Sequence, residues 1–239
     1  MDPVYRQEYT IRSCDVDSMR RLRLSSLFVM LQEAAIAHTT ELGMGRHMTL
    51  DRGFLWVITL QNVWIRRLPV YDEHISIISW PERSMHIYFP RSFRIEDADG
   101  ELLVEASTVW GLMDQKTRHL IFPEDHGINI DGCREMPSLP FPKVPSPEVL
   151  QEMCTYTVPY SCTDINGHMN NTRYFDLAED MMPPELRSRA VNEISSSFDS
   201  EIFLGDTVSL FSSFDGDTYV IEGRNSSGKR CFRVRLTYS

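Results

Sequence analysis

The chain has 239 residues, of which 42% are hydrophobic and 24% charged, a composition ordinary for a globular protein. Its net charge of −10 argues against a nucleic-acid binder, whose affinity depends on neutralising phosphates. The five cysteines form no CxxC pair, so we expect reduced thiols in place of a disulfide framework or a zinc site.

The N-terminal residues Met1 to Arg6 lack the charged-then-apolar layout of a signal peptide. No apolar run approaches the about 20 residues that a membrane span needs. We therefore expect a cytoplasmic protein that does not engage a membrane.

The first half of the chain predicts a strand, a helix and a set of further strands. Residues 8–14 form the first expected strand, and Ser25 opens a helix whose apolar run extends from Leu27 to Leu42, with Gly43 as its C-cap. This run leaves little polar face, which is typical of a helix buried on all sides. Further strands are expected at 54–65, 74–80, 85–96 and 101–113, with residues 97–100 as a hairpin turn.

The second half repeats the same order after a proline-rich segment that reads as an extended linker. Tyr156-Thr157-Val158 resembles Tyr9-Thr10-Ile11, and Tyr174-Phe175 resembles Leu27-Phe28, both 147 positions later. A second helix is expected from about residue 171 until Pro183 stops it. Strands are expected at 194–198, 207–214, 219–224 and 230–238, and residues 206–210 match residues 72–76 at an offset of 134.

Each repeat is thus a strand, a long helix and about four antiparallel strands. A helix that is apolar all round needs a sheet curved around it, since a flat sheet covers only one side. We therefore predict an α+β fold of two tandem hotdog units. The expected boundaries are an N-terminal hotdog at 1–122, a linker at 123–150 and a C-terminal hotdog at 151–239.

The stretch from Asp164 to Asn171 carries the densest polar chemistry in the chain. Asp164, Asn166 and His168 occupy alternate positions, so extended backbone would point all three side chains the same way. The alternative is a polar turn in which Asp and Asn cap their own backbone. No Ser or Cys nucleophile lies between the three residues.

The internal repeat tests whether this stretch is structural or chemical. At the two offsets, positions 164, 166, 168 and 201 of the second unit correspond to positions 17, 19, 21 and 67 of the first. The second unit therefore holds Asp164, Asn166, His168 and Glu201 where the first holds Asp17, Met19, Arg21 and Arg67. A purely structural role would require these groups in both copies, so their loss from one copy favours chemistry in the other.

With these motifs the chain resembles the acyl-acyl carrier protein thioesterases, which include plant enzymes and shorter bacterial members. The resemblance is carried by Asp-x-Asn-x-His-x-Asn-Asn at 164–171 with a following Glu201, and by Leu31-Gln32-Glu33-Ala34-Ala35 and Leu55-Trp56-Val57-Ile58 in the first unit. It covers almost the whole chain and implies that Asp164, Asn166, His168 and Glu201 are the catalytic residues. The absence of a transit peptide is what a bacterial-type member would show.

The resemblance also implies hydrolysis of a thioester. Many family members have Cys directly after the Glu, but this chain has Ile202, which favours direct attack by water. We expect Glu201 to be the base, with Asp164 as the alternative or as an orienting group. His168 and Asn166 would bind the carbonyl oxygen, assisted by backbone N–H groups near Asn170 and Asn171.

The substrate that the resemblance implies is a fatty acyl chain on acyl carrier protein. The acyl tunnel would run through the first unit, and its lining candidates are Met30, Ala34, Ala35 and Trp56, although ordinary hydrophobic core is the more common role for any single one of them. Because the carrier is acidic, a local basic face is expected. The arginines that could form it are Arg20, Arg21, Arg23, Arg173 and Arg187.

No GxSxG, HExxH or Walker sequence occurs, and the remaining histidines show no metal spacing, so we expect neither a cofactor nor a metal. His38, on the helix, is expected to be a hydrogen-bonded core residue. Three alternatives stay open: an acyl-coenzyme A thioesterase, a hotdog hydratase or dehydratase, and a non-catalytic acyl-thioester sensor. Either a monomer or a homodimer is compatible with a tandem chain.

Overall fold

The computed structural model describes residues 3–239, and Met1 and Asp2 lie outside the described part. The chain divides into two compact units, Met1–Pro142 and Lys143–Ser239, and the division falls within the proline-rich segment expected at 123–150. No helix among residues 3–239 has the length and apolar character needed to cross a bilayer.

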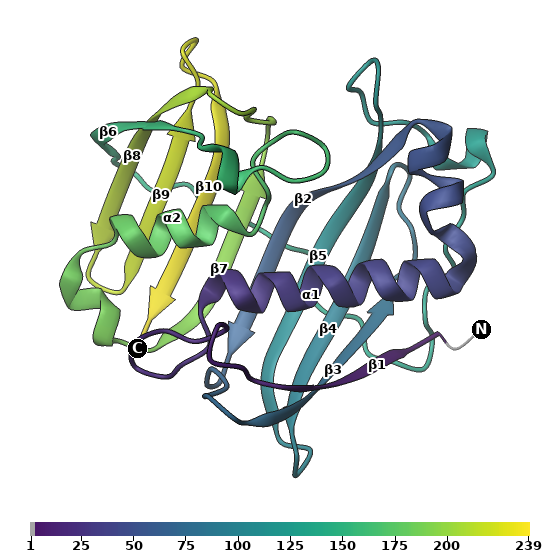
Figure 1. Cartoon of the computed structure of the whole chain (residues 1–239), viewed down its shortest axis with the longest axis horizontal. Coiled ribbons are helices and arrows are strands. Elements are labelled where there is room, and N and C mark those ends of the chain that lie inside the picture. The colour runs from purple at the N-terminus through teal and green to yellow at the C-terminus, as the bar shows by residue number, and fades with distance from the viewer. Residues whose placement is uncertain (1–2) are drawn as a thin grey trace. The chain divides into compact units, whose positions relative to one another are not determined.

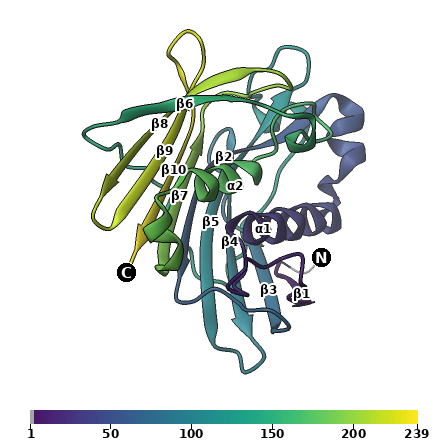
Figure 2. The same cartoon turned by 60° about the vertical axis from the view of Figure 1, so that its left-hand side comes forward.

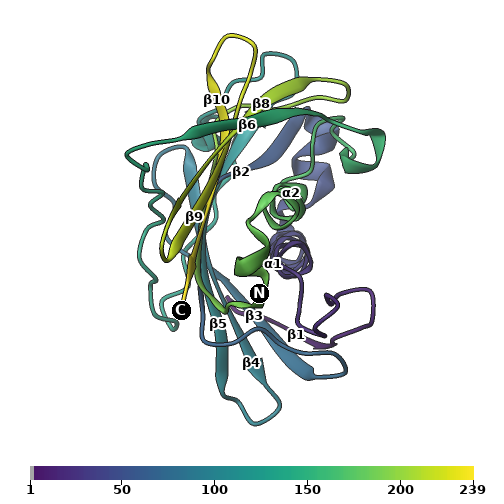
Figure 3. The same ribbon diagram turned by 90° about the vertical axis from the view of Figure 1, so that its left-hand side faces the viewer.

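The first unit is an antiparallel sheet with one long helix across it. Its strands lie in the order β1-β3-β4-β5-β2, and α1 lies across one face of that sheet, which curves around it (Figures 1 and 3). The elements are β1 (Tyr5–Thr10), α1 (Leu24–Thr39), β2 (Phe54–Ile65), β3 (His74–Pro81), β4 (Tyr88–Asp97) and β5 (Leu102–Asp114). Short helical turns follow α1 at Thr40–Met44, Arg46–Met48 and Leu50–Arg52, and another lies at Pro123–His126.

The second unit repeats this topology. Its strands lie in the order β6-β8-β9-β10-β7, with α2 across one face (Figure 2). The elements are β6 (Gln151–Thr157), α2 (Arg173–Met181), β7 (Val191–Phe198), β8 (Thr207–Asp215), β9 (Thr218–Arg224) and β10 (Arg230–Tyr238), with 3₁₀ turns at Tyr160–Cys162 and Pro184–Ser188. The same strand order in both units confirms the tandem hotdog prediction.

Most predicted elements are present with small shifts at their ends. β2 and β10 have the predicted bounds, whereas the first strand ends at Thr10 and does not reach Cys14. The predicted C-cap at Gly43 is wrong, because α1 ends at Thr39 with Thr40 as its C-cap. Gly43 instead adopts φ +83° inside the turn of π-helix that follows, a conformation that glycine accepts without strain.

The prediction that the first helix is buried on all sides is also wrong. Val29, Glu33 and Ile36 are exposed, and their spacing of four and three residues places them on one stripe of α1. The opposite face is buried and includes Leu27, Leu31 and Ala34. Because Val29 and Ile36 are apolar, the hydrophobic pattern of the sequence does not reveal this exposed stripe.

The C-terminal end of α1 is tied to the sheet by buried polar contacts. His38 is fully buried, and its Nδ1 lies 2.9 Å from a guanidinium nitrogen of Arg91 on β4. Arg91 also donates to Ser79 Oγ at 2.9 Å and to Thr39 Oγ1 at 3.2 Å. Burial lowers the pKa of Arg91 to about 9. The expectation of His38 as a hydrogen-bonded core residue is confirmed.

Backbone pairing fixes which residues of the two units correspond. The bridge Val16–Leu22 in the first unit matches Thr163–Met169 in the second, which confirms the offset of 147. The bridges Arg21–Val70 and His168–Phe203 then match as well, which sets the later offset at 133, one less than predicted. Glu201 therefore corresponds to Leu68, not to Arg67, and Asp206 corresponds to Glu73, not to Asp72.

Candidate active site

Two loops of the second unit carry the four candidate catalytic residues. Residues 158–172 precede α2 and hold Asp164, Asn166 and His168, while residues 199–206 follow β7 and hold Glu201. The loops are joined by backbone hydrogen bonds from Met169 N–H to the Ile202 carbonyl at 2.7 Å and from Gly205 N–H to the Val158 carbonyl at 3.0 Å, and by a bridge between residues 168 and 203. This pairing brings Glu201 to His168 although the two are distant in sequence.

A tight turn presents the first three residues. Asp164 N–H donates to the His168 carbonyl at 3.0 Å, and Gly167 N–H donates to the Asp164 carbonyl at 3.0 Å. Gly167 has φ +80°, which explains the glycine at this position. Asp164 Oδ1 accepts the Asn166 N–H at 2.8 Å, so one carboxylate oxygen stabilises the turn and the other remains for the site.

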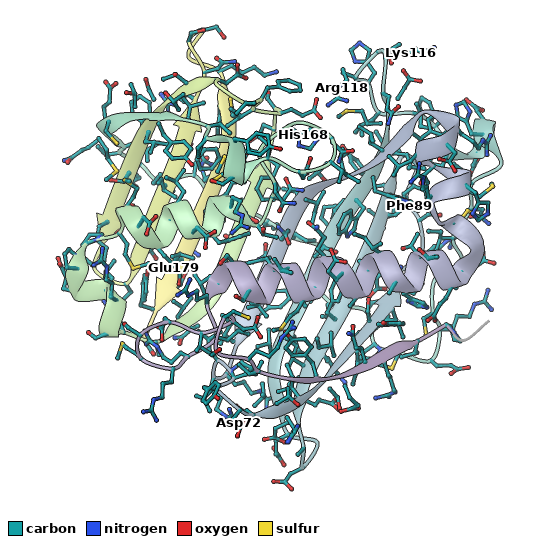
Figure 4. All side chains as sticks on the ribbon, in the orientation of Figure 1. Asp72, Phe89, Lys116, Arg118, His168 and Glu179 are labelled. Atoms are coloured by element: carbon teal, nitrogen blue, oxygen red, sulfur yellow. The ribbon has the colours of Figure 1, made fainter. Side chains whose placement is uncertain are left out.

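His168 lies between two carboxylates, and Figure 4 labels it on the loop ahead of α2. Its Nδ1 is 3.7 Å from Asp164 Oδ2, and its Nε2 is 3.2 Å from Glu201 Oε1. The residue is 8% exposed. Although the second distance is short, Nε2 is not aligned on that oxygen and has no hydrogen-bond partner among residues 3–239. The two groups are therefore close enough to interact electrostatically but do not form a hydrogen bond, which leaves Nε2 available to a ligand.

The amide groups around the turn differ in what they can still bind. The Asn166 side chain is half-buried, and its amide forms no hydrogen bond within residues 3–239. Asn170 N–H, however, donates to the Cys162 carbonyl at 2.9 Å, and Thr172 N–H donates to Asn170 Oδ1 at 2.9 Å. Of the backbone N–H groups expected near Asn170 and Asn171 to assist at the oxyanion, that of Asn170 is already used by the fold, and a role for the others remains a prediction.

The corresponding turn of the first unit has the same backbone pairing but different side chains. Asp17 Oδ1 accepts Met19 N–H at 2.8 Å, as Asp164 does with Asn166. Arg20 occupies the left-handed position of Gly167 with φ +64°. Arg21 forms an ion pair with Asp17 at 3.0 Å, and the position of Glu201 is an apolar residue, Leu68. The first unit therefore has no base at this place.

The residue after Glu201 cannot supply a nucleophile. Ile202 is buried, and its backbone carbonyl holds the two loops together. Among the cysteines, Cys162 is nearest in sequence, and its Sγ lies 3.6 Å from the Tyr156 hydroxyl. Burial raises the pKa of the Cys231 thiol, which makes that cysteine a poor nucleophile.

Two aromatic residues near the site were not identified from the sequence. The Phe203 ring meets the His168 ring edge-on, with 6.3 Å between centroids. Tyr174, in the first turn of α2, packs at a tilt against Phe198 and Phe232 with centroid distances of 5.2 Å and 4.5 Å. In the sequence, Tyr174 is part of the apolar pattern of the second helix. The one signal that it lies near the site is its position four residues after Asn170.

The four candidate lining residues lie in the first unit. Met30, Ala34 and Ala35 belong to the buried face of α1. Trp56 is half-buried on β2, packs edge-on against Phe89 with 5.0 Å between centroids, and leaves its Nε1 without a hydrogen-bond partner among the described residues. Figure 4 labels Phe89 over this sheet. An acyl tunnel along these residues remains a prediction.

Within residues 3–239, no group of three or more His, Cys, Asp or Glu side chains is arranged to hold a metal ion.

The fold and the site together define a double-hotdog protein with a carboxylate–imidazole cluster in one unit. The chain belongs to the acyl-ACP thioesterase family: the model of its N-terminal domain matches residues 2–126, and that of its C-terminal domain matches residues 147–236.

The relatives carry consistent names. A chloroplastic acyl-[acyl-carrier-protein] hydrolase of Cuphea viscosissima is 27% identical over 77% of this chain and 48% of its own length. A chloroplastic palmitoyl-acyl carrier protein thioesterase of Arabidopsis thaliana is 25% identical over 78% of this chain and 49% of its own length. The chain thus spans about half the length of these curated relatives.

Solved structures share the fold over the whole chain. An acyl-ACP thioesterase of Bacteroides thetaiotaomicron superposes with a TM-score of 0.83 at 23% identity and covers 99% of this chain and 98% of its own. The 12:0-ACP thioesterase of Umbellularia californica gives 0.79 at 19% identity, with 100% and 98% covered.

Proposed function

We propose that this protein hydrolyses the thioester of a fatty acyl chain carried by acyl carrier protein and releases the free fatty acid. The observation that carries the proposal is His168 with its two ring nitrogens facing Asp164 and Glu201, in a turn whose twin in the first unit keeps the backbone and lacks the base. Titratable groups gathered in one copy of a duplicated fold indicate chemistry rather than architecture.

The reaction needs a water, a base and a place for the developing oxyanion. The water oxygen bonds to the thioester carbonyl carbon while Glu201 takes one of its protons. The tetrahedral intermediate then collapses, the carbon–sulfur bond breaks, and the proton passes to the departing thiolate. Because Asp164 Oδ1 is engaged by the turn, we assign Asp164 the orienting role and Glu201 the role of base. A well-placed base contributes about 10²–10⁴-fold.

Asn166 is the donor that fits the oxyanion. Its side-chain amide is half-buried and available, and a neutral donor stabilises negative charge without itself changing protonation state. His168 Nε2, which has no hydrogen-bond partner among residues 3–239, serves the same oxygen or the water. Loss of one such donor usually costs about 10²–10³-fold.

The carrier protein is the thiol we favour over coenzyme A, because the curated relatives are named for acyl carrier protein. Two of the arginines considered for docking, Arg21 and Arg173, are already in ion pairs with Asp17 and Asp176 at 3.0 Å each. A carrier that docked on them would have to compete with these carboxylates. The same acyl chain presented on both thiols distinguishes the two substrates by their kcat/KM.

The test measures thiol release by purified variants. Glu201→Gln and His168→Ala are expected to lower kcat by about 10²-fold or more with the thermal unfolding midpoint unchanged within a few degrees. The matched control is Met19→Ala, an exposed residue at the position of Asn166 in the first unit, which should keep wild-type turnover. Near-wild-type kcat in either second-unit variant would refute the assignment. Loss of turnover in Met19→Ala as well would mean that the turn has only a structural role.

A further inference from the structure

A further polar group without a protein partner lies on the helix that follows the loop of His168. Tyr174 is 3% exposed, and its hydroxyl forms no hydrogen bond with any residue in the described part of the chain. Its oxygen is not among the fully buried unpaired atoms, so a water or a ligand can reach it and take the hydrogen bond that the protein does not supply.

Packing fixes the position of the Tyr174 ring. The ring packs at a tilt against Phe198, the last residue of β7, and against Phe232, which pairs with Phe198 across the sheet. The loop that carries Glu201 begins directly after Phe198, and Tyr174 itself follows directly on the loop that carries Asp164 and His168. The ring is therefore held at the end of β7, where the loop that carries Glu201 begins, and at the start of α2, where the loop that carries Asp164 and His168 ends.

The electrostatic environment agrees with this position. Burial, and then the Cys231 thiol and the carboxylates of Asp164 and Glu201, raise the pKa of Tyr174. The phenol therefore stays protonated at any working pH. It can donate a hydrogen bond in the site but cannot serve as a base.

We propose that the Tyr174 hydroxyl is a third hydrogen-bonding group of the active site and holds the attacking water against Glu201. The water donates one hydrogen to the Glu201 carboxylate and accepts a hydrogen bond from the phenol, which fixes its lone pair toward the carbonyl carbon. The inference rests on the proposed hydrolysis, because it assigns a place to the water which that reaction consumes.

Tyr219 shows that an unpaired hydroxyl alone does not make such a site. It is buried on β9 of the same unit, and its hydroxyl has no hydrogen-bond partner among residues 3–239. Burial and then Cys154 raise its pKa, with no contribution from Asp164 or Glu201. Tyr219 is therefore a matched control: a tyrosine of the same unit that is buried as a residue, with a hydroxyl that is without a partner and not influenced by the two carboxylates.

The experiment compares Tyr174→Phe with Tyr219→Phe in the full chain on acyl carrier protein substrate. Tyr174→Phe keeps the aromatic ring and its packing and is expected to lower kcat by about 10- to 100-fold with KM and the unfolding midpoint nearly unchanged. Tyr219→Phe is expected to keep wild-type kcat. Wild-type kcat in Tyr174→Phe overturns the inference, and so does an equal loss in both variants.

Two further results separate this inference from the proposed function. If Glu201→Gln and His168→Ala lose turnover and Tyr174→Phe does not, only the role of Tyr174 fails, whereas retained turnover in those two variants removes the proposed function itself. Should Tyr174→Phe not fold, a fluorinated tyrosine at position 174 keeps the ring and lowers the pKa of the phenol. Turnover should then fall at alkaline pH relative to the wild type, and an unchanged profile overturns the inference.

Discussion

Single side chains distinguish the two halves of this chain more than any backbone difference does. The turn at Asp164 and the turn at Asp17 share their bridges and their capping hydrogen bond. Replacing His168 by Arg21 turns a titratable imidazole into a permanently charged guanidinium that pairs with Asp17. Replacing Glu201 by Leu68 removes a carboxylate, and Met19 stands where the second unit has Asn166. Under the proposed function, these three substitutions on the same backbone pairing account for one catalytic copy and one non-catalytic copy.

Glu73 illustrates a charge whose contribution is to stability. Both its carboxylate oxygens accept hydrogen bonds from Arg67, at 2.7 Å and 3.0 Å, and one also accepts Val70 N–H at 2.8 Å. The bonds from Arg67, and then that from Val70, lower the pKa of Glu73 despite partial burial. Because the pKa is lower in the folded state, the stabilisation is present above the unfolded pKa and is lost as pH falls through the folded value.

We predict that Glu73→Gln lowers the free energy of unfolding by about 1 kcal/mol at pH 7, and that the difference from wild type shrinks as pH falls below about 4. Urea unfolding at both pH values measures it. Glu101→Gln, at an exposed position ahead of β5, is the control and should change little. An equal difference at both pH values would contradict the role of the charge.

Packing between elements links the sheet of the second unit to its active site. Gly223 on β9 faces the Phe232 ring on β10, and a Cβ at position 223 would fall on that ring. Phe232 in turn supports Tyr174 at 4.5 Å between centroids. The glycine is needed here for space, because the aromatic stack of β10 and α2 occupies the volume of a side chain.

We predict that Gly223→Ala lowers the free energy of unfolding by about 1–3 kcal/mol, the usual range for overpacking a core. It should also lower kcat, because the displaced Phe232 moves Tyr174 away from Glu201. Denaturant unfolding and thiol release measure the two effects. Gly216→Ala, in a turn where a Cβ meets nothing within 4 Å but φ is +57°, should cost some stability through backbone strain and leave kcat unchanged. Unaltered stability in Gly223→Ala would show that Phe232 yields without strain.

At the scale of the whole molecule, the duplicated fold permits a division of labour between the units. The candidate catalytic groups belong to the second unit, and the candidate lining residues belong to the first. In the second unit the helix is short, with nine residues, whereas α1 has 16. A longer apolar helix offers more surface to an acyl chain, and each buried CH₂ contributes about 0.8 kcal/mol.

We predict that Ala34→Phe shifts the chain-length preference toward shorter acyl chains. Each CH₂ excluded from the site should lower kcat/KM for long chains by about fourfold, while turnover of the shortest chains is kept. A thiol-release series over acyl chain length measures this, with thermal unfolding as a check on packing. Ile36→Phe, on the exposed stripe of α1, is the control. An unchanged profile in Ala34→Phe would exclude this face of α1 from acyl binding.

Local patterns in the sequence determined much of this protein. The repeat, the strand limits of β2 and β10, the hairpin at residues 97–100 and the motif from Asp164 to Asn171 follow from side-chain periodicity and turn chemistry, which act over a few residues. The amphipathic nature of α1 was missed because Val29 and Ile36 are apolar and exposed.

Only the tertiary structure decided how the site is assembled. The offset of 133, the approach of Glu201 to His168, the use of Asn170 N–H by Cys162 and the place of Tyr174 all depend on backbone bridges between the two loops. Those bridges form between residues far apart in the sequence, and a one-residue change in their register would exchange which side chain faces His168. The local periodicity of the sequence does not specify that register. The register is set only when the sheet, the helix and both loops pack together.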